Sequence, residues 1–347
     1  MLRLSAFQRL CFAVVLVLMS SSSAHAQNNA SYKLTPRDAD YIAAESADVK
    51  THVMLANTDA ANATKESGIT IQGNHSAASR GRGAPEIPLS LYPADLTHQG
   101  GPVIASAEHH ALFLHANGAC ATVAECWGDP ESFLRDLGRS QFIHVTDQYV
   151  RANGEDRYNV GFNAHIALSM SGNMLSRGTI LAILHSAGSA TNATGYNHIY
   201  HLFLPPGVST CLQAGVCYSP DNADTFAFCA YHGAVTFKDI GHIVYTVEPY
   251  QAVPGCHVAL PSPNGQIADS TNSVLSHETF EAITDPDLNA WWNRSSLALQ
   301  GSEIGDQCQP LYDKGFLVPT FKIGKNIYKV QLEYSNSAHR CVARANE

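Results

Sequence analysis

The chain has 347 residues, of which 45% are hydrophobic and 15% charged. This is enough apolar material to bury a large core in one or two domains. The formal net charge is −9, and because an acidic chain is a poor candidate for binding nucleic acid, we expect no nucleic-acid partner.

The N-terminus has the pattern of a secretory signal peptide. Arg3 and Arg9 precede an apolar run from Leu10 to Met19, and small residues follow up to Ala26. This order predicts cleavage after Ala26, and the apolar run is too short to span a bilayer. Loss of the two arginines would take the net charge from −9 to −11. We therefore expect a secreted mature protein, extracellular or periplasmic, without a membrane span.

Residues 27–95 differ from the rest in composition. They are rich in Ala, Asn, Thr and Ser, lack cysteine, and end in a basic segment rich in Gly and Pro at 79–88. This composition predicts a low-complexity leader or pro-segment followed by a linker. Exposed Arg80 and Arg82 would suit removal of a pro-segment, and a disordered leader that stays attached is the alternative. We expect the folded domain to occupy residues 96–347.

The folded domain is predicted to mix strands with a few helices. A helix is expected over Asp129–Phe142, because Asp129 suits the N-cap and Pro130 the first turn. Residues 179–188 fit either a helix or a buried strand. Apolar, aromatic runs predict strands at 111–116, 198–206, 240–250 and 325–335. The pattern favours an α+β fold with a mixed sheet.

Eight cysteines remain once Cys11 leaves with the signal peptide. An even number in an exported chain predicts disulfides, although the sequence leaves the connectivity open. A zinc–thiolate cluster is the competing interpretation, but no C-x-x-C spacing supports it. We expect the near neighbours to pair as 120–126 and 211–217, with 229–256 and 308–341 closing longer loops.

The stretch "HETFE" at 277–281 is close to the H-E-x-x-H pattern of zinc peptidase helices, with a glutamate in place of the second histidine. We predict a helix over 271–285, capped by Asp269, Ser270 or Thr271 and stopped by Pro286.

His277 and Glu281 are four residues apart, so both side chains project from one side of this helix and can bind one ion. Glu278 lies beside them and can act as a general base on a metal-bound water. The alternative is an ordinary surface helix with a polar face.

Further ligands are expected from the downstream segment "GSEIGDQC", which contains Glu303 and Asp306. We expect Glu303 to complete the metal site and Asp306 to orient a ligand or join the metal. Gly301 and Gly305 would let the backbone approach closely, and a simple glycine turn is the alternative.

Among the other histidines, His232 in "CAYHG" can approach the metal or donate to a transition state. The pairs His109/His110 and His198/His201 would point to opposite sides of a strand, so we expect structural roles for them. His185 does not lie near a G-x-S-x-G elbow, which gives a serine hydrolase little support.

Several motifs occur in one order, at residues 101–104, 127–150, 228–233, 262–292 and 302–308. In this order they resemble the secreted EXORDIUM / phosphate-induced protein family and its microbial relatives, which carry HExxE, TDP and E-x-G-D-x-C. The resemblance covers about residues 98–347 and implies a zincin-like metal-site pattern. The family is associated with cell-wall or extracellular growth effects in plants. Carried over by position, the resemblance implies one site from His277, Glu278, Glu281, Glu303 and Asp306.

Three functional hypotheses follow. The first is a secreted metal-dependent hydrolase, a zinc metallopeptidase acting on an extracellular protein or peptide, with zinc on His277, Glu281 and Glu303. Its anionic ligand set makes Ca²⁺ or Mn²⁺ harder to exclude. The second is a non-enzymatic module that binds a cell-wall polymer and carries a structural ion. The third is a carboxyl face that only forms hydrogen bonds.

Overall fold

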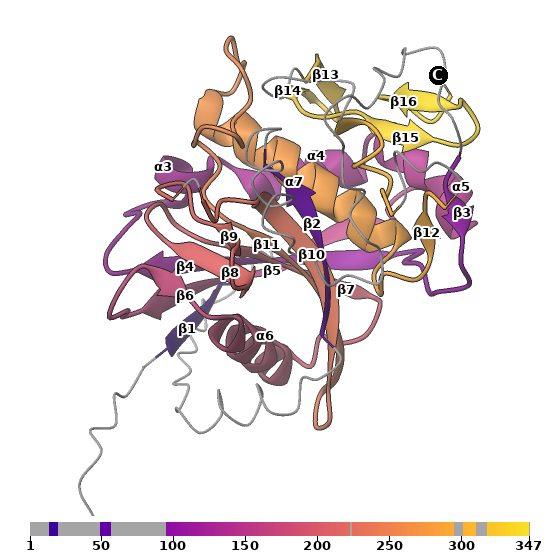
Figure 1. Cartoon of the computed structure of the whole chain (residues 1–347). Coiled ribbons are helices and arrows are strands. Elements are labelled where there is room, and N and C mark those ends of the chain that lie inside the picture. Colours follow the sequence, from indigo (N-terminus) through magenta and orange to yellow (C-terminus); the bar gives the residue numbers. More distant parts are fainter. Residues whose placement is uncertain are drawn as a thin grey trace, which may run out of the picture.

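The computed structural model describes residues 14–19, 49–56, 95–222, 224–294, 301–309 and 318–346. A seven-stranded mixed sheet organises the fold, with strand order β1-β5-β4-β7-β11-β10-β2 (Figure 1). The four central strands β5, β4, β7 and β11 are parallel to one another. β1 pairs antiparallel with β5, and β10 pairs antiparallel with both β11 and β2. The strands are β1 Val14–Met19, β2 Lys50–Leu55, β4 Ala107–Ala116, β5 Tyr158–Leu168, β7 His198–Phe203, β10 Phe228–Phe237 and β11 Gly241–Glu248.

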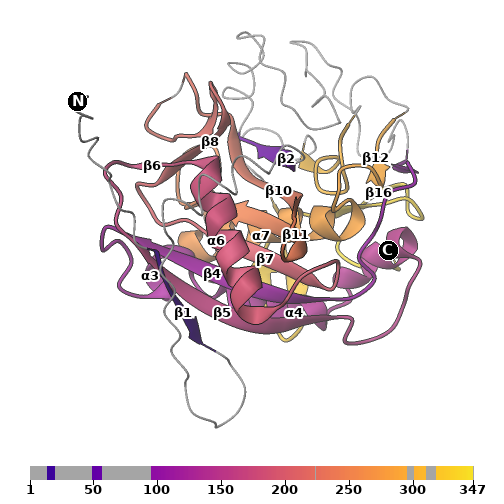
Figure 2. The same cartoon turned by 90° about the horizontal axis from the view of Figure 1, so that it is seen from below.

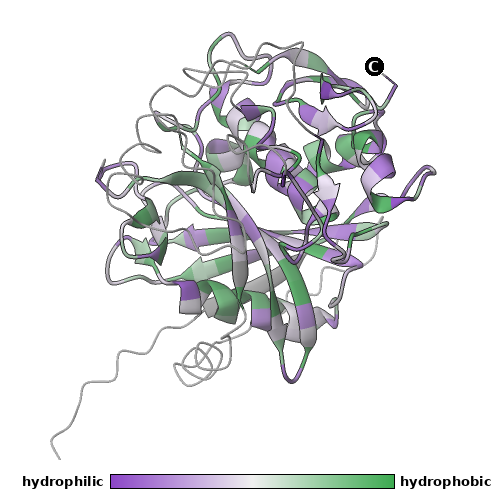
Figure 3. Cartoon of the chain, turned by 45° about the vertical axis from the view of Figure 1, so that its right-hand side comes forward, coloured by the Kyte–Doolittle hydropathy of each residue, from purple (hydrophilic) through white to green (hydrophobic). Residues whose placement is uncertain are grey.

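Two long helices cover opposite faces of this sheet. Helix α6 (Arg177–Thr191) lies on one face, as the view from below shows (Figure 2), and α7 (Gln266–Thr284) crosses the other. Because side chains alternate along a strand, Leu112 and Leu114 of β4 pack into the core under α6. Phe113 packs into the core under α7 with Phe280. Many residues along the strands of the sheet are accordingly hydrophobic, as the green segments in Figure 3 show.

Shorter elements pack around α7. The helices there are α3 Val123–Trp127, α4 Pro130–Gly138, the 3₁₀ helix Ile143–Thr146 and α5 Asp147–Val150. Among them, α4 also packs on β5 of the sheet. Small antiparallel pairs join β3 Thr97–His98 to β12 Trp291–Trp292, β13 Thr320–Ile323 to β14 Asn326–Lys329, and β15 Glu333–Ser335 to β16 Arg340–Val342. A separate three-stranded sheet contains β6 Met174–Leu175, β8 Ser209–Gln213 and β9 Val216–Tyr218.

Most predicted elements are confirmed. The Asp129 carboxylate accepts the Ser132 amide at 3.1 Å and caps α4, although α4 ends at Gly138, before Phe142. The ambiguous segment 179–188 lies inside the helix α6. The single strand expected over 325–335 is wrong, because β14 and β15 are separate strands with different partners.

The boundaries of α7 differ from the prediction at one end. It stops at Thr284, just before Pro286, as expected, but it starts at Gln266 after Gly265. Asp269 is therefore not its N-cap. Its carboxylate instead accepts the Asn264 amide N–H at 3.1 Å and so fixes the turn that leads into the helix.

All four expected cysteine pairs form disulfides: Cys120–Cys126, Cys211–Cys217, Cys229–Cys256 and Cys308–Cys341. In each pair the two cysteines are near neighbours among the eight along the chain. The four disulfides join α3 to the loop before it, β8 to β9, β10 to the loop after β11, and the segment 301–309 to β16.

Two strands come from segments expected to lie outside the folded domain. β1 covers part of the predicted signal peptide and pairs with residues 163–168 of β5. β2 falls inside the expected leader and pairs with β10. The Ser79–Pro88 linker lies outside the described residues. Within the described ranges, no helix is long and apolar enough to cross a membrane.

Candidate metal centre

Helix α7 is enclosed on every side. It contacts β10, β11 and β2 below and α3, α4 and β14 above. His277, Glu278 and Glu281 have no exposed surface at all. The ordinary surface helix considered from sequence is therefore wrong, and the polar side chains of α7 face other protein groups.

The expected ligands His277, Glu281 and Asp306 meet at one point. His277 Nε2 lies 3.0 Å from Glu281 Oε1 and 3.7 Å from Asp306 Oδ1. The Asp306 amide donates to Glu281 Oε1 at 3.3 Å. The i,i+4 spacing on α7 and the following loop thus place one imidazole and two carboxyl groups together.

A further candidate ligand, His52, was missed by sequence reasoning. It lies on β2, opposite His232 of β10 in the strand register. His52 Nε2 is 2.7 Å from Asp306 Oδ2, and His52 Nδ1 is 3.5 Å from Glu303 Oε1. The signal that could have found it is the short apolar run around it, "HVML" at 52–55, inside an otherwise polar segment.

His232 approaches the cluster from β10. Its Nδ1 lies 3.3 Å from Glu278 Oε2 and 3.4 Å from Glu281 Oε2. Its Nε2 lies 3.3 Å from the Asp285 carbonyl oxygen and 3.6 Å from Glu303 Oε2. The structure therefore brings together all six residues predicted for the site and adds His52.

Local packing fixes the orientation of His277. Gly305 lies against the imidazole so closely that a Cβ atom there would be 2.5 Å from Nδ1. The Gln331 side-chain amide donates to the Gly305 carbonyl at 2.6 Å and lies 3.2 Å from the same Nδ1. The disulfide Cys308–Cys341 holds the loop that carries Gly305 in place.

Seven buried carboxyl groups surround three histidines at this site. The carboxyl groups belong to Glu248, Glu278, Glu281, Asp285, Glu303, Asp306 and Glu333, and the histidines are His52, His232 and His277. Several of these oxygens have no hydrogen-bond partner among the described residues, namely Glu278 Oε1, Glu281 Oε2 and both oxygens of Glu303. Such buried, unsatisfied anionic groups are costly unless a cation compensates them.

The pKa shifts reflect this crowding. Burial and then the neighbouring Glu281 raise the pKa of Glu278 well above its usual range. Burial, followed by Asp285 and Glu281, does the same to Glu303. Burial opposes ionisation of Glu281 too, but His277, His232 and His52 together outweigh it and lower the pKa of that carboxyl. Burial would lower the pKa of His52, yet Asp306 raises it to about 9.

Two groups of ligand atoms in this cluster have the spacing of a metal site. One contains His52, Glu281 and Asp306, the other His232, Glu278 and Glu281, and the atoms of each lie within 4.8 Å of one another. Both groups are buried. These groups can hold a metal ion.

The other histidines have structural partners. His109 Nδ1 is 2.8 Å from His201 Nε2, and His110 Nε2 is 2.9 Å from His198 Nδ1, as strands β4 and β7 pair. His185 pairs with Asp239 at 2.8 Å.

His110 and His198 form a third group of three with Glu108. The Phe162 amide donates to His110 Nδ1 at 3.2 Å, so Nε2 carries the proton and donates to His198. A metal would displace that proton from the neutral ring, which leaves this group without a vacant nitrogen on His110.

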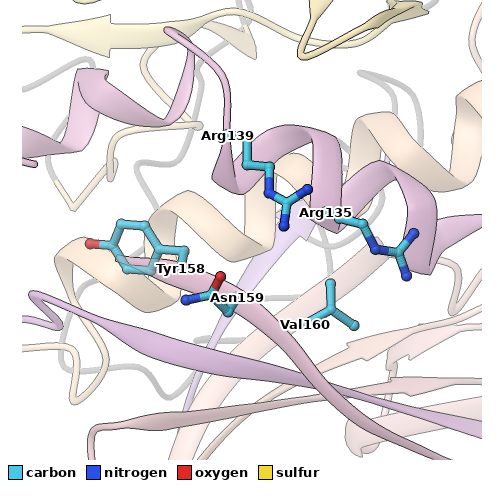
Figure 4. Close-up of a pocket in the computed structure, with 5 residues that line it drawn as sticks. All are labelled: Arg135, Arg139, Tyr158, Asn159 and Val160. Carbon is cyan, nitrogen blue, oxygen red and sulfur yellow. The ribbon is translucent and has the colours of Figure 1, made fainter. Parts of the chain in front are cut away.

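A surface pocket lies apart from the cluster. Arg135 and Arg139 of α4 and Tyr158, Asn159 and Val160 of β5 line it (Figure 4). No residue of the cluster takes part, and both arginines are exposed. The pocket is therefore separate from the buried cluster.

No protein-family model, curated protein or solved structure matches this chain. The resemblance to the EXORDIUM family therefore stays a prediction.

Proposed function

We propose that the protein is a secreted metal-dependent hydrolase, a zinc metallopeptidase that acts on extracellular proteins or peptides. The observation that carries this proposal is the convergence of His277, Glu281 and Asp306 at a fully buried point beside Glu278. The HExxE helix lying along a mixed sheet supports a zincin-like architecture. The disulfides and the N-terminal sequence support export.

The distances favour His277, Glu281, Asp306 and His52 as the ligands, a revision of the set expected from sequence. Two imidazoles and two carboxylates suit zinc better than Ca²⁺, which prefers six to eight oxygen ligands. Mn²⁺ remains the nearest competitor. Glu303 lies behind these ligands. Its Oε1 is 3.5 Å from His52 Nδ1, and its Oε2 is 3.6 Å from His232 Nε2. Such carboxylates orient metal-binding histidines.

Catalysis would require a cation that lowers the pKa of a bound water and polarises the scissile carbonyl. Glu278 is the residue placed to take the proton, because its Oε1 has no hydrogen-bond partner in the described chain. His232, whose Nδ1 lies 3.3 Å from Glu278 Oε2, would position that carboxyl.

The second candidate is a non-enzymatic extracellular module, which binds a cell-wall polymer and carries a structural ion. The complete burial of His277, Glu278 and Glu281 favours it, because structural metal sites are closed and catalytic sites keep an open position.

One experiment separates the two candidates. The mature protein is purified, its metal content is measured, and cleavage of an unstructured protein is assayed for wild type and Glu278→Gln. Glu155→Gln, at an exposed loop position, serves as the control. The hydrolase proposal predicts that Glu278→Gln keeps the metal ion at His277 and loses at least about 100-fold in turnover. Bound metal without Glu278-dependent turnover would favour the structural ion, and absence of metal would contradict both.

A further inference from the structure

The two carboxylate oxygens of Glu281 face opposite sides of the cluster. Oε1 lies 3.0 Å from His277 Nε2 and accepts the Asp306 amide. Oε2 lies 3.4 Å from His232 Nδ1 and has no hydrogen-bond partner among the described residues. Glu281 therefore stands between two separate sets of ligand atoms, one around His277 and one around His232.

The tautomer of His232 defines the second set. Its Nε2 lies 3.3 Å from the Asp285 carbonyl oxygen, which only accepts hydrogen bonds, so Nε2 carries a proton. In the neutral ring, Nδ1 then has a lone pair, and it points at the carboxylate oxygens of Glu278 and Glu281 at 3.3 and 3.4 Å. Three electron-pair donors that converge on one buried point need a proton or a metal cation among them.

One divalent cation at His277, bound through Glu281 Oε1, leaves Glu281 Oε2 and Glu278 Oε2 facing His232. Seven carboxyl groups are buried around the three histidines. The ion pairs that the structure shows for Glu278, Glu281 and Glu303 all involve histidines. A second cation beside His232 would compensate the oxygens that the first cation does not reach.

We propose that the cluster binds two divalent cations, with Glu281 as the bridging carboxylate. His277, Asp306, His52 and Glu281 Oε1 hold the first, and His232 Nδ1, Glu278 Oε2 and Glu281 Oε2 hold the second. Two-metal sites bridged in this way place the ions roughly 3.5–4 Å apart. Glu278 then binds through one oxygen and keeps Oε1 for the proton. This inference shares its first cation with the proposed function and adds the second.

Metal stoichiometry tests the inference without recourse to activity. The protein is stripped with a chelator, reconstituted with Zn²⁺, freed of excess metal, and analysed by elemental analysis and native mass spectrometry. We expect two zinc ions per chain in wild type and one in His232→Gln. His185→Gln on α6, remote from the cluster, is the control and should retain two. Circular dichroism shows whether each variant is folded.

Reconstitution with Mn²⁺ gives a second measurement that needs no variant. Two Mn²⁺ ions bridged by Glu281 are magnetically coupled, so the electron paramagnetic resonance spectrum of wild type should differ from that of an isolated ion. One zinc per chain, together with an uncoupled Mn²⁺ spectrum, overturns the inference and indicates that His232 is instead protonated.

The outcomes separate this inference from the proposed function. One zinc with Glu278-dependent turnover refutes the second cation and leaves the hydrolase intact. Two zinc ions without turnover support the second cation and refute the hydrolase. Two zinc ions retained in a folded His232→Gln variant would refute the assignment of His232.

Discussion

At the scale of single residues, the site depends on how tightly His277 is held. Its ring lies between the Glu281 carboxylate and Gly305, whose missing side chain lets the backbone approach the imidazole. A histidine held this way loses little conformational freedom when it binds an ion. The glycine of the "EIGD" segment is thus a packing requirement of the site, beyond its role in a turn.

Gly305→Ala should therefore damage the site directly. The added Cβ would lie 2.5 Å from His277 Nδ1 and push the ring away from Glu281. We expect a loss of roughly 1–3 kcal/mol in the free energy of unfolding and a weaker metal affinity. Gly172→Ala is the matched control, since a Cβ there meets no atom within 4 Å. Equal metal affinity in both variants would refute the packing role of Gly305.

The metal-free protein should lose stability as the pH rises above neutrality. Asp306 raises the pKa of His52 to about 9 in the folded state, from 6.5. Protonated His52 therefore stabilises the folded state through Asp306. This contribution to the free energy of unfolding is complete below about pH 6.5 and is lost as the pH rises through 9. Metal binding has the opposite pH dependence. It strengthens as the pH rises, because His52 must lose its proton to bind the ion. Urea unfolding with and without zinc at pH 6.5 to 9 measures how the free energy of unfolding changes with pH in each case. The same pH dependence with and without zinc would contradict the assignment of His52.

At the scale of elements, α7 and β2 show what the sequence could and could not predict. The i,i+4 pair His277 and Glu281 follows from helix geometry alone, and the disulfides follow from near-neighbour pairing. The burial of α7 was not predictable from its many Ser, Thr and Asn residues. Some of them are satisfied by backbone groups of distant loops, such as Ser273, which accepts the Gln331 amide at 3.2 Å.

β2 escaped prediction for a related reason. His52 meets Asp306 across a separation of 254 positions. The pairing of β2 with β10 and the hydrogen bond from Gln309 to the Leu55 carbonyl bring them together. The composition of residues 27–95 as a whole is polar, so it did not indicate that six of them form the strand β2. Tertiary pairing of this kind leaves no local periodicity in the sequence.

The Cys308–Cys341 disulfide should matter more than the others for metal binding. It closes a separation of 33 residues and anchors the loop that carries Glu303 and Asp306. By loop entropy its removal costs about 4 kcal/mol, against roughly 2 for a six-residue separation. Replacing both cysteines by serine should lower stability and zinc affinity together. The double serine variant of Cys211–Cys217, which also spans a separation of 6, is the control and should keep the affinity.

At the scale of the whole molecule, the fold encloses a negatively charged site in its interior. The sheet, α7 and the C-terminal hairpins all contribute residues to it, from His232 on β10 to Glu333 on β15. Folding therefore requires that charge to be neutralised by protons or by cations. This makes metal binding and global stability one linked equilibrium.

Chelation should lower the melting temperature substantially. A cation present at 100 times its dissociation constant contributes about 2.7 kcal/mol, equivalent to roughly 5–10 °C for a domain of this size. Calorimetry before and after treatment with a chelator, followed by addition of zinc, measures the loss and its recovery. An unchanged melting temperature after verified removal of metal would show that protons alone neutralise the cluster.

The most direct test of the central claim is anomalous X-ray diffraction from crystals of the zinc-reconstituted protein. We predict an anomalous peak at the zinc edge about 2.0–2.2 Å from His277 Nε2 and from oxygens of Glu281 and Asp306. A second peak should lie beside His232. An ordered cluster without any peak, in which His277 and Glu281 remain in direct contact, would contradict the metal centre.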